Sequence, residues 1–438
     1  MAVKAPRGTA DLLPQEARAW DQLSRLALRI FGSYGYEPIE TPIFEQTDMF
    51  TRGIGEATDV VGKEMFQVLS KNAYATLLEG GKLAADQRLS LRPEGTASVV
   101  RAVQEHNLVP SGAAPAKLMY FGPMFRCERP QKGRLRQFHQ IGAECLGAHE
   151  PSVDAEMIIM LMRFFEKAGV PRSNMRLIIN SMGDDNCRPA YRDSVRDFIL
   201  AHGSELCDEC NRRAHTNPLR ALDCKNPACK QVLAAAPTID NALCDDCRAH
   251  YEAVKAYLDM AGIEYVEDPH LVRGLDYYTN TVFEVQVIDG LGSQNAIGGG
   301  GRYDKLMESV GGKPTPGIGF ALGFERLMLA LEAAGVQLGG GSHLDVFVAC
   351  VDASMRAASF KVLQSLRDAG VRADADHQAR SLKSQFKLAD KLAAPLVVVV
   401  GPDEFERGEV TLRDMASKEQ RNVSIEELPT AVKGLLGE

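Results

Sequence analysis

Basic side chains crowd one short stretch of this chain. Residues 117–146 read as two strand-like runs joined by a loop. The basic residues of the loop and its margins are Arg126, Arg129, Lys132, Arg134 and Arg136. An arginine guanidinium matches the geometry of phosphate oxygens, so this concentration of positive charge indicates a polyanion site. The alternative is an exposed hairpin loop that only keeps the protein in solution, because charged residues mostly face water.

Strand periodicity sorts the side chains of this hairpin by face. Side chains alternate between the two faces of a strand, so Arg126 and Glu128 share one face of the first run. Phe138, Gln140 and Glu144 share one face of the second run by the same rule. Phe138 could stack on a nucleotide base, which together with the arginines predicts a nucleotide site.

The composition restricts the class of protein. The chain has 438 residues, 45% apolar and 25% charged, which is typical of a globular protein with two or three domains. It contains no transmembrane-length apolar run and no signal-peptide core, so we expect a cytoplasmic protein without membrane contact. A net charge of -8 argues against a DNA-binding protein. Any RNA contact must therefore come from local basic patches.

Helix and strand patterns supply the frame for these residues. An amphipathic helix is expected from the first turn at Pro14 to Gly35, with Asp11 as its N-cap. The other expected helices and strands of the first part cover residues 155–168, 281–288 and 320–334. After a flexible linker at Gly339–Ser342, strands at 344–351 and 396–400 alternate with a helix at 355–369. That alternation predicts a small α/β domain over 344–438.

The hairpin resembles motif 2 of the class II aminoacyl-tRNA synthetases. The matching residues are Phe125-Arg126-x-Glu128, the basic loop, and Arg136-x-Phe138. The resemblance implies that Arg126 binds the α-phosphate of ATP and the amino-acid carboxylate, and that Phe138 stacks on adenine. It also implies that Glu128 and Arg134 bind ATP. The acceptor end of the tRNA would contact Arg129 and Gln131.

Two further segments resemble motifs of the same class. Gly317–Leu329 is similar to motif 3, which implies that Arg326 contacts the γ-phosphate of ATP from a rigid helix. A core helix with a surface arginine is the alternative. The segment around Pro42 resembles motif 1, and this implies a homodimer.

The amino acid is indicated by three segments. Leu271–Thr279 and Ala296–Asp304 resemble the two signatures of histidyl-tRNA synthetases, and Leu91–Ala97 resembles their substrate loop. The histidine-binding residues implied by this resemblance are Glu94, Gly95, Thr96, Arg126, Gln140, Glu144, Arg273, Tyr277, Tyr278 and Tyr303. These types fit, because an ammonium group needs carboxylate or hydroxyl acceptors and a neutral imidazole presents one donor and one acceptor. A half-buried strand pair at Tyr277–Tyr278 and an ordinary turn at Gly298–Gly301 are the alternatives.

The implied reaction joins L-histidine to its tRNA. ATP is a substrate and binds together with Mg²⁺. The histidine carboxylate is already ionised, so no general base is needed and catalysis must come from positioning and charge stabilisation. The catalytic residues would be Arg126, Arg273 and Arg326. A regulatory paralogue, a purely RNA-binding protein and a synthetase for another amino acid are the alternatives.

The cysteines gather in one region. We interpret residues 171–262 as a module inserted into a catalytic domain of residues 1–338, and seven of the ten cysteines lie there. Cys-x-x-Cys spacing is typical of structural zinc sites, which favours one site of Cys207, Cys210, Cys244 and Cys247. Cys224 and Cys229 would then be spare. Spacing alone does not decide which four bind, and free thiols are the alternative.

The expected fold class is α/β (α+β). The resemblance implies an antiparallel-sheet class II catalytic domain with the inserted module. It also implies that residues 344–438 form an α/β anticodon-binding domain. Arg380, Lys383, Lys387 and Lys391 fall at helical spacing and form a basic stripe, either for RNA phosphates or as a solvated face.

Overall fold

The computed structural model describes residues 2–55, 58–292, 295–340 and 342–437. These residues form two units, Met1–Gly339 and Gly340–Glu438, each with buried cores of its own. The expected linker residue Gly341 lies outside the described residues. Gly339 is not a free linker residue, because its N–H donates to Gln22 Oε1 (2.9 Å) and its carbonyl accepts from Arg18 Nε (2.8 Å). The prediction of a flexible segment is therefore wrong at this position.

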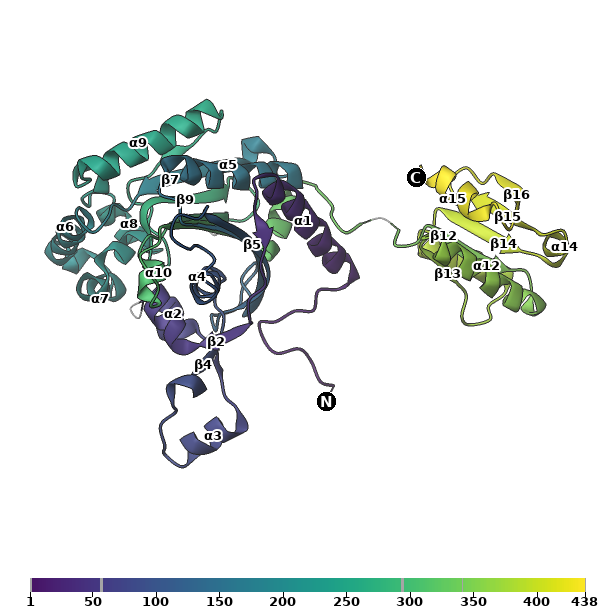
Figure 1. Cartoon of the computed structure of the whole chain (residues 1–438), viewed down its shortest axis with the longest axis horizontal. Helices are drawn as coiled ribbons and strands as arrows, with labels where there is room; N and C mark the ends of the chain where they lie inside the picture. Colours follow the sequence, from purple (N-terminus) through teal and green to yellow (C-terminus); the bar gives the residue numbers. More distant parts are fainter. Residues whose placement is uncertain (1, 56–57, 293–294, 341, 438) are drawn as a thin grey trace. The chain divides into compact units, whose positions relative to one another are not determined.

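An eight-stranded sheet forms the centre of the first unit (Figure 1), in the order β1-β5-β6-β11-β10-β9-β7-β8. In that order the strands are Glu37–Pro38, Ala116–Phe125, Gln137–Leu146, Gly317–Gly323, Ala296–Arg302, Thr279–Val287, Met175–Ser181 and Val266–Glu267. Only the β1–β5 and β7–β8 pairs are parallel. The expected antiparallel-dominated fold is thus confirmed. A second sheet has the order β2-β4-β3 (Phe44–Gln46, Leu89–Leu91 and Gln67–Val68).

Helices cover both faces of the central sheet. The helices of this unit are α1 (Pro14–Ser33), α2 (Thr47–Ile54), α3 (Lys71–Leu78), α4 (Thr96–Glu105), α5 (Pro151–Ala168), α6 (Arg188–Ala201), α7 (Asp208–Thr216), α8 (Pro227–Leu233), α9 (Asp245–Met260), α10 (Leu306–Ser309) and α11 (Phe324–Ala333). Shorter turns of helix are η1 (Val60–Glu64), η2 (Ala85–Gln87), η3 (Arg172–Asn174), η4 (Gly203–Glu205), η5 (Pro218–Asp223) and η6 (Ile239–Asn241). Buried residues of α1, α5, α9 and α11 form one core with the sheet. Helix α4 lies within the curve of the sheet, on its other face (Figure 1).

Helix α1 begins where a proline can start a helix. Pro14 occupies the first turn, where a missing N–H costs nothing. Buried Ala19, Leu23 and Ala27 recur at four-residue spacing, as expected for a helix that covers a core. The N-cap is Leu13, which has no side-chain hydrogen bond to the helix, so the assignment of Asp11 as the cap is wrong.

The sheet extends into the region that we assigned to an insert. Met175–Ser181 forms β7 and pairs with β9, from Met175 opposite Val287 to Ser181 opposite Thr281. The insert therefore does not begin at residue 171, because the apolar run of β7 is buried in the sheet. We use "helical module" for residues 184–247, which contain α6, α7 and α8 and lead into α9.

Two glycine-rich segments are strands. Gly298–Gly301 lies inside β10, between β9 and β11, so its reading as a turn is wrong. Gly317–Gly323 forms β11, so the helix that follows begins at Phe324 and not at residue 320. A Cβ atom on Gly300 would lie 2.0 Å from the carbonyl oxygen of Gly319. Glycine thus lets the two strands approach each other closely.

The second unit is a five-stranded sheet with helices, in the order β13-β12-β14-β15-β16. In chain order its strands are β12 (Val346–Cys350), β13 (Ala373–Ala375), β14 (Leu396–Val400), β15 (Glu409–Asp414) and β16 (Gln420–Ser424), and its helices are η7 (Ala353–Met355), α12 (Arg356–Asp368), α13 (Leu382–Lys391), α14 (Pro402–Glu406) and α15 (Leu428–Leu436). Arg380 precedes α13 and is held by Asp376, which accepts from its backbone N–H (2.7 Å) and its Nη1 (2.9 Å). Arg380 is therefore not part of the helical basic stripe.

Candidate active site

A cleft of about 1190 Å³ lies over strands β6, β11, β10 and β9. It brings together side chains that are as much as 267 positions apart in the sequence, from Asp59 to Arg326. The predicted site residues that line it are Glu94, Thr96, Arg126, Glu128, Arg134, Phe138, Gln140, Arg273, Tyr277, Tyr278, Tyr303 and Arg326. The large sheet supplies the floor, since it places these positions at fixed spacings on one face.

Arg126 lies at the end of the first hairpin strand, immediately after β5. Its backbone N–H donates to the carbonyl of Arg136 (2.9 Å), and its Nε donates to the carbonyl of Pro93 (2.9 Å). Its guanidinium carbon is 5.3 Å from the centre of the Phe138 ring. The guanidinium is therefore fixed between the substrate loop and the aromatic ring.

Arg326 projects from the first turn of α11. Its Nη1 donates to the carbonyl of Ala296 (2.8 Å), and its Nε donates to that of Gly133 (3.4 Å). Burial lowers the pKa of this guanidinium, and the positive charges of Arg134 and Arg126 lower it further. An anion that enters between these arginines would relieve their mutual repulsion.

Arg273 is anchored by a carboxylate on the sheet. Its Nη1 donates to Glu284 Oε2 (2.5 Å), and its backbone carbonyl accepts from Arg220 Nη1 (2.9 Å). A Cβ atom on Gly299 would lie 3.0 Å from the Arg273 guanidinium. The glycine strand thus leaves the space that this side chain occupies.

Glu144 lies beneath the cleft and is fully buried. Thr96 Oγ1 donates to its Oε1 (2.6 Å), and the hydroxyl of Tyr303 donates to its Oε2. Burial raises the pKa of Glu144 to about 8, and the charge of Glu94 contributes, although the two hydroxyl donors oppose the shift. The carboxyl group therefore keeps its proton to a higher pH than an exposed glutamate does.

Glu94 and the tyrosines form the remaining wall. Both carboxylate oxygens of Glu94 accept backbone N–H groups at the start of α4, from Thr96 and Ala97 (each 2.8 Å). Burial raises the pKa of Glu94, and these backbone donors counteract the shift. The ring centres of Tyr277 and Tyr278 are 4.8 Å apart, and that of Tyr303 lies 5.6 Å from Tyr277. Tyr277 and Tyr278 thus lie in the cleft wall just before β9 and are not a strand pair.

Two buried atoms of the cleft residues have no hydrogen-bond partner within the described part of the chain. They are Gln140 Oε1, an acceptor, and Arg273 Nε, a donor. An unpaired buried polar atom costs about 1–3 kcal/mol, so each favours a ligand with the complementary group. An amino acid offers that pair, because its ammonium donates and its carboxylate accepts.

Some predicted residues lie elsewhere. Gly95 lies against Tyr120, whose ring would be 2.3 Å from an added Cβ atom. Arg129 and Gln131 are exposed in the hairpin loop, where Gln131 and Arg134 form an isolated bridge. Neither of these loop residues contributes to the cleft lining.

Two contributors were not among the predicted site residues. Glu284 pairs with Arg273, and Arg220 holds the Arg273 backbone. The alternation of Glu284 and Gln286 with apolar neighbours in β9 could have indicated a polar strand face. Arg220 gives no local signal, since its role depends on a contact across 53 positions.

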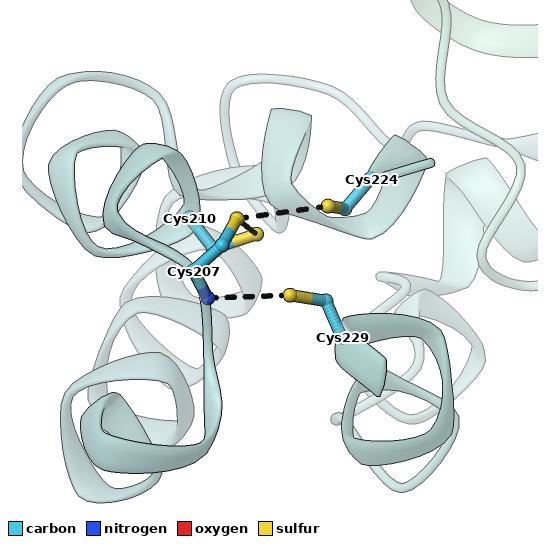
Figure 2. A group of neighbouring side chains, drawn as sticks. All are labelled: Cys207, Cys210, Cys224 and Cys229. Carbon is cyan, nitrogen blue, oxygen red and sulfur yellow. Dashed lines mark hydrogen bonds between the residues drawn. The ribbon is translucent and has the colours of Figure 1, made fainter. Parts of the chain in front are cut away.

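The cysteines form two separate clusters and not the predicted one. Cys207 and Cys210 lie beside Cys224 and Cys229 (Figure 2). The second cluster contains Asp184, Cys187, Cys244 and Cys247. The prediction of a single site from Cys207, Cys210, Cys244 and Cys247 is therefore wrong. Each Cys-x-x-Cys pair begins a different helix, α7 or α9, and meets partners from another part of the module.

Comparisons with known proteins address the whole chain. Residues 8–327 match a family model described as histidyl-tRNA synthetase, and residues 345–435 match one described as an anticodon binding domain. A histidine–tRNA ligase of Desulforamulus reducens is 46% identical over 435 residues and covers 99% of each chain. The corresponding ligase of Geobacillus kaustophilus is 46% identical over 429 residues, which are 98% of this chain and 97% of that one.

Solved structures agree with these matches. The crystal structure of apo S. aureus histidyl-tRNA synthetase has a TM-score of 0.80 at 37% identity, over 99% of this chain and all of its own (100%). A Bacillus halodurans protein described as an ATP phosphoribosyltransferase regulatory subunit/histidyl-tRNA synthetase has a TM-score of 0.62 at 20% identity. The match covers 91% of this chain and 98% of that one. That second likeness concerns the fold alone.

Proposed function

Since this chain belongs to the histidyl-tRNA synthetase family and is an aminoacyl-tRNA ligase, we propose that its central cleft activates L-histidine with ATP. A carboxylate oxygen of histidine attacks the α-phosphorus. The bond from that phosphorus to the bridging oxygen breaks, and pyrophosphate leaves. A ribose hydroxyl at the 3′ end of the tRNA then attacks the carbonyl carbon, loses its proton and displaces AMP. The observation that carries this proposal is one cleft in which Arg126, Arg273 and Arg326 lie beside a buried carboxyl and tyrosine pocket.

The amino-acid half of the cleft follows from its unpaired atoms. Gln140 Oε1 accepts from the histidine ammonium, and Arg273 Nε donates to the carboxylate. The imidazole lies among Tyr277, Tyr278 and the Glu144–Tyr303 pair, which offer both donors and acceptors. The enzyme thereby distinguishes histidine from apolar residues of similar size, which would leave buried polar groups unpaired.

The ATP half is the arginine cluster. Arg126 lies between the two halves and stabilises the charge that develops on the α-phosphate, and Arg326 holds the departing pyrophosphate. Phe138 supplies the aromatic surface for adenine, and Glu128 and Arg134, which pair at 3.1 Å, border it. No proton-transfer residue is needed for the first step, because the nucleophile is already charged.

Mg²⁺ would accompany the phosphates. The carboxylates of Glu128 and Glu284 line the cleft, and oxygen donors of this kind suit a hard cation. When bound, the ion would neutralise phosphate charge. These glutamates also orient Arg134 and Arg273, so they set the guanidinium positions whether or not the ion is present.

The tRNA and a second copy of the chain would contact other surfaces. The exposed loop with Arg129 and Gln131 is positioned for the acceptor end, and the second unit is the anticodon-binding part. Pro42, Ile43 and Phe44 form an exposed apolar run, which supports a homodimer through this segment. None of the described helices combines the length and apolar character needed to cross a bilayer. The cytoplasm, where tRNA and ATP meet, is the compartment that this function predicts.

One assay tests the proposal directly. Purified protein is supplied with ATP, labelled pyrophosphate and each standard amino acid in turn, and exchange into ATP is measured. We expect exchange with histidine alone. Absence of a histidine signal would support the regulatory alternative, and a stronger signal with another amino acid would overturn the specificity.

A further inference from the structure

We propose that the helical module binds two structural zinc ions. The first site consists of Cys207, Cys210, Cys224 and Cys229, and the second of Asp184, Cys187, Cys244 and Cys247. Within each group, four ligand atoms lie within 4.8 Å of one another. Cys224 is among the residues that line the cleft, but no residue of either group takes part in the chemistry described above, so the proposal stands apart from the proposed function.

The first site has the dimensions of a zinc–thiolate tetrahedron. A Zn–S bond of about 2.3 Å requires neighbouring sulfurs to be about 3.8 Å apart. The Sγ of Cys207 lies 3.6 Å from that of Cys210 and 4.0 Å from that of Cys224 (Figure 2). A disulfide would need about 2.05 Å, so these distances suit a shared ion and not a covalent pair.

The fold around the first site holds its ligands in place and favours negative charge at Cys207. Cys207 is the N-cap of α7, where the helix dipole favours negative charge. The backbone N–H of Cys207 points to the Sγ of Cys229 at 3.2 Å, which is a typical second contact of a metal-bound sulfur. Cys210, Cys224 and Cys229 are buried, so each ligand is already ordered by the fold.

The second site repeats this arrangement with one oxygen. The Sγ of Cys187 lies 3.8 Å from that of Cys247 and 3.3 Å from Asp184 Oδ1, which is 3.9 Å from the Sγ of Cys244. Cys244 is the N-cap of α9, as Cys207 is of α7. Asp184 Oδ1 also accepts the backbone N–H of Asn186 at 2.9 Å, which fixes its orientation.

Zinc is the ion that these ligands favour. Soft thiolates in tetrahedral arrangement select zinc or iron, and zinc needs no redox partner. The helices that the first ion would join are short: α7 has nine residues and α8 has seven. Isolated helices of this length are marginal in water, so an ion that cross-links them would contribute folding free energy.

Each site also lies beside an arginine that donates a hydrogen bond to the backbone of segment 273–278. Arg220, four residues before Cys224, donates to the carbonyl of Arg273 (2.9 Å). Arg188, next to Cys187, donates to the carbonyl of Tyr278 (2.6 Å). The two ions would thus stabilise the two ends of segment 273–278 through positioning residues.

Metal analysis of the full-length protein, purified under reducing conditions, tests the proposal. We expect about two zinc ions per chain, falling to about one in Cys210→Ser and to about one in Cys247→Ser. Cys350→Ser in the second unit is the matched control and should keep both. Fewer than two ions in the wild type, or iron in place of zinc, would overturn the proposal.

Cobalt substitution keeps the test decisive if the cysteine variants do not fold. The wild-type protein is produced with Co²⁺ in place of zinc, and its folding is checked by circular dichroism. Intense visible bands of tetrahedral cobalt with thiolate charge-transfer bands are expected at two ions per chain. Weak octahedral bands, or binding of a single cobalt ion, would contradict it.

Discussion

At the scale of single residues, Arg273 is the arginine that we assign to the amino-acid half of the cleft. Glu284 neutralises one side of its guanidinium, while the buried Nε has no hydrogen-bond partner among the residues described. The ion pair with Glu284 therefore orients the Arg273 guanidinium and leaves its Nε donor unused. The free donor is where charge on the reacting groups is expected to develop.

Arg273→Ala should therefore slow adenylate formation more than it weakens histidine binding. Loss of one such donor lowers a rate by about 10²–10³-fold, whereas the buried pocket around Glu144 still holds the imidazole. Histidine-dependent pyrophosphate exchange gives both the rate and KM. Arg25→Ala, on the exposed face of α1, is the control, and exchange near the wild-type rate in Arg273→Ala would remove its catalytic role.

Glu144 makes a prediction about stability and pH. Its pKa of about 8 in the folded protein exceeds the ordinary value of 4.5, so the folded state keeps a proton that the unfolded chain has released. The free energy of unfolding should fall as pH rises between about 5 and about 8. Glu144→Gln lacks this titration, so its Tm relative to the wild type should increase over that window.

Thermal unfolding across this pH range measures the effect. Glu16→Gln in the exposed first turn of α1 is the control, and its difference from the wild type should stay constant. If the Tm difference between Glu144→Gln and the wild type does not change with pH, the carboxyl group is ionised in the folded protein over the whole range.

At the scale of elements, strand β11 decides whether the pocket can form. It lies between β6 and β10, so the hairpin and the second histidine signature do not touch as adjacent strands. Tyr303 nevertheless reaches Glu144 of β6, because Gly317 and Gly319 present no side chains between them. Gly317 and Gly319 therefore shape the pocket through the space that they leave.

Gly319→Ala should disrupt this pocket. The new Cβ atom would lie 1.6 Å from Glu144 Oε2 and 2.8 Å from the carbonyl oxygen of Ala143. We expect overpacking to cost about 1–3 kcal/mol and histidine activation to be lost. Denaturant unfolding and pyrophosphate exchange measure the two effects.

Gly32→Ala in α1 is the matched control for that substitution. Nothing lies within 4 Å of its added Cβ atom, so the helix should gain up to about 1 kcal/mol. If Gly319→Ala activates histidine at the wild-type rate, Glu144 need not keep its present position.

At the scale of the whole molecule, the chain is two units with separate cores. The cleft residues all belong to the first unit. The proposed function thus divides between the two units, with chemistry on the small substrates in the first and anticodon binding in the second.

A fragment that ends at Gly340 should remain folded and keep histidine-dependent pyrophosphate exchange. Its aminoacylation efficiency, as kcat/KM for tRNA, should fall by at least about tenfold, equivalent to ~1.4 kcal/mol of lost binding. Adding the second unit as a separate chain should not restore it, because the effective concentration that the covalent link provides is gone. Unchanged tRNA charging by the fragment would overturn this division of roles.

The sequence by itself determined the features that depend on neighbouring residues. Alternation in the hairpin placed Phe138, Gln140 and Glu144 on one face, and the apolar spacing placed α1, α5 and α12 within a few residues of their observed bounds. The arginines were recognisable from type and spacing, because a guanidinium presents the same fork of donors to phosphate in any fold. Histidine was indicated by the resemblance of Leu271–Thr279 and Ala296–Asp304 to family signatures, which are also read from neighbouring residues.

Only the tertiary structure decided the features that depend on contacts between distant segments. It brought Cys207 and Cys210 close to Cys224 and Cys229 and extended the sheet through β7. It also made strands of both glycine-rich segments. It also buried Glu144, which raises its pKa, and placed Glu284 against Arg273. Burial and pairing are properties of the folded surroundings, and residues far apart in the chain carry no local mark of which partner they will meet.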